Sequence, residues 1–98
     1  MKFLVLMEVR NNFPPSQAVD AQKAIGAQIQ KIMQSGKVKE MGVFADMRGG
    51  FFLGDFDSAE ELFNLTAPIK DVAEFTAHPV VGLDTLGKFF EEYAKAHR

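Results

Sequence analysis

The first ten positions of the chain have the pattern of a β-strand with one entirely apolar face. In the stretch MKFLVLMEVR, every second residue from Phe3 to Val9 is apolar, and a period of two is typical of a β-strand with one buried face. We therefore expect a strand over residues 2–10. Its second face changes from apolar to charged along the strand, through Leu4, Leu6, Glu8 and Arg10.

The next pattern has the spacing of an α-helix. Apolar residues return every three or four positions from Val19 to Met33, and Ser16 stands where an N-cap residue would precede them. Gly36 follows the last of them, as the left-handed residue that often terminates a helix. We expect one long helix between Ser16 and Gly36.

Two more strands and a short helix are predicted in the middle of the chain. The strands cover residues 38–47 and 51–56, and Gly49 and Gly50 would supply the positive φ of a tight turn between them. Ser58 and Glu61 have the spacing of a capping box at the start of a helix, which Pro68 would end.

The last third of the chain predicts a strand and a final helix. Residues 72–78 alternate, so that Ala73, Phe75 and Ala77 share one face and Glu74, Thr76 and His78 the other. A helix capped by Asp84 follows, with an apolar stripe made of Leu86, Phe89, Phe90 and Tyr93.

This order of elements predicts an α+β fold. A β-α-β-β-α-β order is the ferredoxin-like motif, in which helices cover one face of a four-stranded antiparallel sheet, and here a C-terminal helix is added. We expect one such domain over residues 1–98. The first and last strands are then antiparallel neighbours, which brings Glu8 close to Glu74.

Composition excludes several classes of function. The net charge is −2, without the basic excess that binding to nucleic acid requires. The chain has no cysteine for a disulfide or a thiolate nucleophile, and its apolar runs are too short to span a bilayer. The N-terminus has no signal-peptide pattern, so we expect a cytoplasmic protein with no membrane partner.

The first eighty residues or so resemble a known family. The features are the first strand FxVxMxV, the helix end at Gly36–Lys37, the segment DFDSAEEL and the strand ending EFTAHP. On these features the chain is similar to the muconolactone isomerase-like group of the dimeric α+β barrel proteins. The resemblance implies a homodimer or larger homo-oligomer in which two sheets pack face to face and enclose a small pocket. The final helix is an addition relative to those enzymes.

Glu8 is the leading candidate for chemistry on the face that this pocket would enclose. Enclosure on a mostly apolar face favours the protonated form of a carboxylic acid, and a group that exchanges protons near neutral pH can act as a general acid or base. Glu74 would share its proton, and His78 has the chemistry of a proton shuttle. The predicted catalytic residues are Glu8, Glu74 and His78, and the predicted ligand-binding residues are Leu4, Leu6, Arg10, Phe44, Phe52 and Thr76.

Two histidines and no cysteine do not form a metal-binding pattern, and we expect no metal and no cofactor. The leading interpretation is a cofactor-free isomerase that transfers a proton on a small lactone or carboxylated metabolite. A noncatalytic oligomeric module that binds a small ligand remains open, with Glu8 and Arg10 forming interface ion pairs. A cofactor-independent monooxygenase-like barrel is the third alternative.

Overall fold

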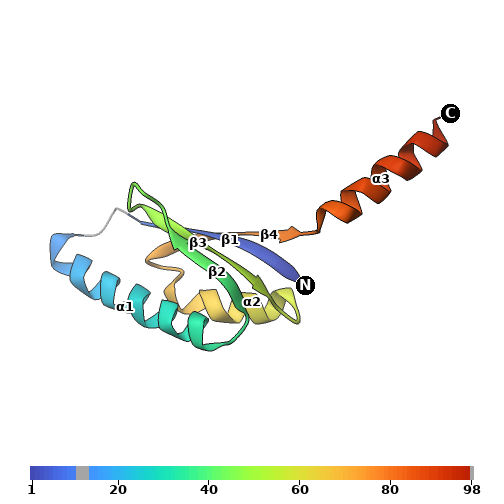
Figure 1. The fold of residues 1–98 in the computed structure, drawn as a ribbon. Helices are drawn as coiled ribbons and strands as arrows, with labels where there is room; N and C mark the ends of the chain where they lie inside the picture. Colours follow the sequence, from blue (N-terminus) through green and yellow to red (C-terminus); the bar gives the residue numbers. More distant parts are fainter. Residues whose placement is uncertain (11–13, 98) are drawn as a thin grey trace.

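The computed structural model describes residues 1–10 and 14–97 (Figure 1). Within them the elements follow the predicted order, and the final helix extends away from the rest of the molecule. The elements are β1 (Lys2–Val9), α1 (Pro15–Gln34), β2 (Val38–Val43), β3 (Gly49–Asp55), α2 (Ala59–Thr66), a 3₁₀ turn η1 (Ala67–Ile69), β4 (Ala73–Val80) and α3 (Leu83–Ala96).

The four strands form one antiparallel sheet in the order β2-β3-β1-β4. This is the ferredoxin-like topology that the sequence predicts. Helices α1 and α2 lie on one side of the sheet, and Figure 1 shows the other side without a helix. We call this second side the open face. The sheet therefore has one face that builds the core and one that is free to form a site.

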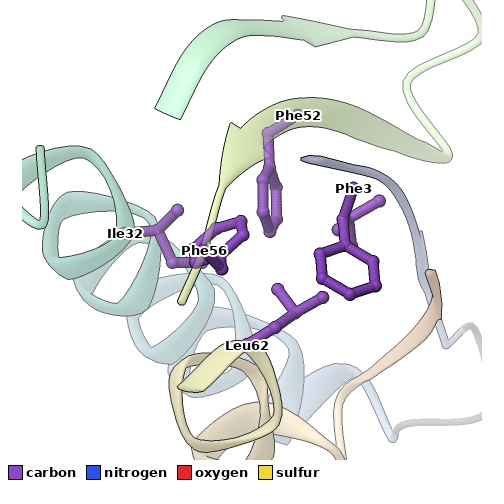
Figure 2. Close-up of a cluster of buried hydrophobic side chains, with 6 residues drawn as sticks. Phe3, Ile32, Phe52, Phe56 and Leu62 are labelled. Carbon is purple, nitrogen blue, oxygen red and sulfur yellow. The ribbon is translucent and has the colours of Figure 1, made fainter. Parts of the chain in front are cut away.

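The core lies between the sheet and the two helices (Figure 2). Val5 is fully buried, because alternation along β1 points every second side chain toward α1 and α2, and Phe56, directly after β3, is fully buried beside it. Phe52 and Phe56 meet edge to face, with ring centroids 6.2 Å apart. Each such side chain contributes about 2–3 kcal/mol when buried. The main cluster consists of Phe3, Val5, Ile32, Phe52, Phe56 and Leu62.

The N-caps of both long helices lie two residues before the predicted ones. The N-cap of α1 is Pro14 and not Ser16, because Pro15 fits the first helical position, where no N–H is needed. The N-cap of α3 is Gly82 and not Asp84, which lies in the first turn. Gly36 follows α1 with φ of +74°, as predicted.

The β2–β3 hairpin differs from the prediction. Gly49 and Gly50 belong to β3, and the residue with positive φ in the turn is Met47, at +61°. Both glycines are needed for a different reason. A Cβ on Gly49 would collide with the Met7 carbonyl oxygen, and a Cβ on Gly50 would collide with the Gly42 carbonyl oxygen. The turn itself contains Asp46, whose Oδ1 accepts a hydrogen bond of 3.0 Å from the Arg48 N–H. Asp46 thereby stabilises the turn.

The start of α2 confirms the predicted capping box in a slightly shifted form. Ser58 Oγ accepts a hydrogen bond of 3.1 Å from the Glu61 N–H. The Glu61 carboxylate accepts one of 2.9 Å from the N–H of Asp57, one residue before the cap. Two N–H groups at the helix start are thereby satisfied. No helix in the described part of the chain is both long and apolar enough to cross a membrane.

Candidate active site

The open face carries an apolar centre and a charged end. Strand register places Leu4 beside Leu53 and Leu6 beside Phe51, and all four side chains are only half-buried. Further along β1 the same face presents Glu8. Such a mixture of apolar surface and acid is unusual on a face left to water. It marks this side of the sheet as the place for a site.

A hollow of about 370 Å³ lies at the charged end of the open face. Its central feature is Glu8 on β1 directly opposite Glu74 on β4 in the antiparallel ladder. Residues directly opposite in such a ladder have Cβ atoms about 4.5–5.5 Å apart. The lining residues are Leu6, Met7, Glu8, Phe44, Asp46, Arg48, Glu74 and Thr76.

The two carboxylates form a like-charge pair. Like charges directly across a ladder destabilise a sheet, and a proton on either group removes the repulsion. Within residues 1–10 and 14–97, neither Glu8 nor Glu74 has an ion-pair partner within 4.0 Å. Arg10 forms no ion pair among those residues either.

The hairpin turn contributes a cation to the hollow that the sequence analysis did not assign. Arg48 lies next to Gly49, and Gly49 pairs with Glu8 in the β1–β3 ladder. The Arg48 carbonyl oxygen accepts a hydrogen bond of 2.8 Å from the Val9 N–H, which fixes the turn against β1. The sequence could have predicted this position, because β3 begins opposite Glu8 and the residue just before β3 must therefore lie near Glu8. The misplaced turn hid this position.

Several predicted residues meet in the hollow. Glu8, Glu74, Leu6, Phe44 and Thr76 all line it, although they come from β1, β4 and the turn after β2. Phe44 follows β2 directly and is fixed there by a hydrogen bond of 2.9 Å from its N–H to the Gly49 carbonyl oxygen.

Leu4 and His78 lie on the open face but outside the hollow. They face each other in the β1–β4 ladder, four residues along from Glu8 and Glu74. At about 3.4 Å per residue this separation is roughly 13 Å. Arg10 lies past the end of β1 and lines a different depression, beside α2 and β4.

Phe52 is not on the open face, and this part of the prediction is wrong. It pairs with Val5, and only 2% of its surface is exposed. The predicted strand began after the glycines, so its register was not tied to β1. Side chains of paired residues point to the same face, and Val5 belongs to the core. Phe51 and Leu53 occupy the positions on the open face instead.

The described residues contain no group of three or more His, Cys, Asp or Glu side chains that could hold a metal ion. The hollow itself presents three carboxylates (Glu8, Asp46 and Glu74), one guanidinium (Arg48) and an apolar wall.

A family model described as a domain of unknown function, DUF3303, matches residues 1–94. The chain belongs to this family. The match extends over nearly all of α3, so the C-terminal helix is part of the family's domain. Comparison with curated proteins finds no match.

Two solved structures share the fold. A crystal structure of muconolactone isomerase is 15% identical, with a TM-score of 0.64 over 84% of this chain and 90% of that one. The second structure is 5-chloro-2-hydroxyhydroquinone dehydrochlorinase (TftG) from Burkholderia phenoliruptrix AC1100, in complex with 2,5-dihydroxybenzoquinone. It is 17% identical, with a TM-score of 0.60 over 83% of this chain and 94% of that one. The likeness confirms the predicted ferredoxin-like fold of the muconolactone isomerase group.

Proposed function

We propose that the protein is a cofactor-free enzyme that moves a proton on a small lactone or carboxylated metabolite, in a cavity formed between two copies of the chain. The observation that carries the proposal is the pairing of Glu8 with Glu74 in a hollow that also contains Arg48. The names of the two neighbours agree with it, because an isomerase of a lactone and a dehydrochlorinase both act on small oxygenated rings.

The pair of acids can transfer a proton without a cofactor. Of the two groups, Glu8 starts as the carboxylate and Glu74 holds the proton. Glu8 takes a proton from a carbon beside the substrate's carbonyl, and the electron pair forms an enolate. Glu74 then returns its proton at a different carbon, so the double bond shifts and the pair again holds one proton. Arg48 would bind the substrate's carboxylate or carbonyl oxygen and stabilise the enolate.

A second copy is needed to close the site. The hollow is open on the side away from the helices, where Leu4, Leu6, Phe51 and Leu53 are half-exposed. Packing two open faces together would bury these side chains and exclude water from the acids. The low dielectric of such an enclosure strengthens the electrostatic effects of Arg48 and of the pair. His78 is too distant to take part from within the same subunit.

The test is proton NMR of muconolactone and related unsaturated lactones in deuterated buffer. We expect the wild type to exchange a substrate proton for deuterium or to shift the double bond. Glu8→Gln removes the base but keeps the shape, and should lower the rate by about 100-fold or more. Glu60→Gln, an exposed glutamate on α2, is the matched control and should behave as the wild type.

Failure of this proposal has a clear signature. If the wild type is a folded oligomer that exchanges no proton in any of these substrates, the proton-transfer function on lactones is refuted. If Glu8→Gln is as active as the wild type, the chemistry lies elsewhere. In the first case a noncatalytic ligand-binding module becomes the better account.

A further inference from the structure

The C-terminal helix is the largest part of the chain without a partner. Helix α3 extends away from the sheet (Figure 1), and no residue in it is buried. The molecule measures 64 Å along its longest axis and has a radius of gyration of 17.3 Å. A compact chain of this length has a radius of about 13 Å. The helix therefore packs against no other element in the part of the chain that the structure describes.

One side of α3 is apolar and the opposite side is charged. The charged side consists of Asp84, Lys88, Glu91, Glu92 and Lys95, separated from the apolar stripe by roughly half a turn. Aromatic contacts order the stripe, since Phe89 lies 5.6 Å from Phe90 and 6.1 Å from Tyr93 between ring centroids. The apolar stripe consists of Leu83, Leu86, Phe89, Phe90 and Tyr93, all with 47–84% of their surface exposed.

An apolar groove of about 200 Å³ lies on the helix side of the sheet, between α1 and the β2–β3 hairpin. Ile29, Met41 and Met7 line it, and no charged residue is among its lining residues. Its outer rim is formed by Val43 and Met47, which are 77% and 83% exposed. Met47 holds this position with a positive φ, where asparagine or glycine is normally found. The chain thus accepts backbone strain to present an apolar side chain at the rim.

The helix cannot lie in the groove of its own chain. β4 is on the opposite edge of the sheet from β2, and it ends beside Lys2 at the opposite end from the groove. From the strand spacings, the two corners are roughly 27 Å apart. Only Val81 and Gly82 connect β4 to α3, which is itself about 21 Å long. At full reach only the tip of the helix would arrive.

We propose that α3 is an intermolecular arm, whose apolar stripe docks in the groove between α1 and the β2–β3 hairpin of a second copy of this chain. The exchange is reciprocal, so each copy gives one helix and receives one. This inference goes beyond the proposed function and does not depend on the chemistry of Glu8.

The size of the two surfaces agrees with a second copy. The five stripe side chains expose on the order of 500 Å² of apolar surface. Two such stripes expose on the order of 1,000 Å² between them, and with the groove surfaces that they cover the buried area reaches the lower part of the range of a stable interface, about 1,200–2,000 Å². A lipid surface is a poorer match, because helices that lie on membranes have polar faces rich in lysine and arginine. The polar face of α3 has three acids and two lysines.

Tyr93 makes the proposal directly measurable. It is the only tyrosine, and the chain has no tryptophan, so tyrosine fluorescence reports on α3 alone. We expect acrylamide to quench Tyr93 weakly at micromolar protein and at least about threefold more strongly on dilution, as the arm is released. Protection that does not change with concentration would show docking within one chain and would overturn the proposal.

The groove is tested with Met47→Asp. Asp tolerates a positive φ better than Met, and the position is exposed, so the variant is expected to fold. It should expose Tyr93 to quencher at concentrations where the wild type is protected. Val43→Asp is the second groove variant and should act in the same way.

Leu6→Lys on the open face separates the two contacts, because it removes the contact that the proposed function needs. Compared at concentrations where each variant still associates, it should leave Tyr93 protected. If Leu6→Lys exposes Tyr93 while both groove variants leave it protected, the helix docks on the open face and the groove is refuted. If Tyr93 is fully exposed in the wild type at every concentration, α3 binds no second copy. Lactone exchange by Glu8 is read separately, so failure of either proposal is recognised independently.

Discussion

At the residue scale, two features determine the sheet: glycines that allow strands to approach closely, and alternation that places a side chain on one face or the other. The sequence correctly predicts that Glu8, Leu6 and Thr76 share a face, because their strands alternate cleanly. It fails at Phe52, since two glycines suggested a turn that lies three residues earlier. The sequence predicts alternation within one strand, but it does not predict the register between strands. Register depends on backbone contacts such as Gly49 against Met7, which leave no periodic pattern.

Gly49→Ala should therefore destabilise the protein strongly for so small a change. The added methyl would collide with the Met7 carbonyl oxygen, and overpacking of this kind costs about 1–3 kcal/mol. Gly26→Ala is the matched control, because a Cβ there meets nothing within 4 Å. In the middle of a helix it should stabilise by about 0.5–1 kcal/mol. Urea unfolding of both variants measures the difference. Equal effects would contradict the assigned register of β3.

At the element scale, α2 is fixed to the end of α1 by an ion-pair network. Lys37 Nζ lies 3.3 Å from Asp57 Oδ2 and 3.4 Å from Glu61 Oε1. The capping residues of α2 were predicted from spacing alone, because they act within five residues of each other. Lys37 was not, since it comes from a loop twenty residues away from Asp57. Local motifs are thus predictable where contacts between elements are not.

Stability should depend on this lysine in a pH-dependent way. The hydrogen bond to Asp57, together with the negative charges of Asp57 and Glu61, raises the pKa of Lys37 above its usual 10.5. A raised lysine pKa stabilises the fold fully below the unfolded value, and this contribution is lost as pH rises through the folded pKa. Lys37→Gln should lower the free energy of unfolding at neutral pH. The difference from the wild type should shrink above pH 10.5.

Denaturant titrations of the wild type and Lys37→Gln at several pH values measure this difference. Lys23→Gln, an exposed position on α1, is the control and should show no such trend. A gap for Lys37→Gln that stays constant well above pH 10.5 would contradict a role for the ion pairs.

At the scale of the whole molecule, a monomer leaves three apolar surfaces in water: the open face of the sheet, the stripe of α3 and the groove beside the β2–β3 hairpin. The open face of the sheet and the stripe of α3 lie on different parts of the molecule. Both were visible in the sequence as amphipathic patterns, whereas the projection of α3 away from the sheet was not. An amphipathic pattern predicts which side of a helix or strand is buried, but it does not predict whether the same chain or a second copy buries it. In the proposed assembly a second copy covers the open face, which encloses the acids, and the stripe of α3, which holds the pair together.

The central claim is that two open faces close over the Glu8–Glu74 hollow, and sedimentation velocity tests it most directly. We expect the wild type to be a dimer or larger at micromolar concentration. Leu6→Lys places a charge in the middle of the contact and should weaken association by about tenfold or more. Gln22→Lys, an exposed position on α1, should associate as the wild type does. A monomeric wild type, or a Leu6→Lys variant that associates as tightly as the wild type, would contradict the enclosed site and the chemistry proposed for it.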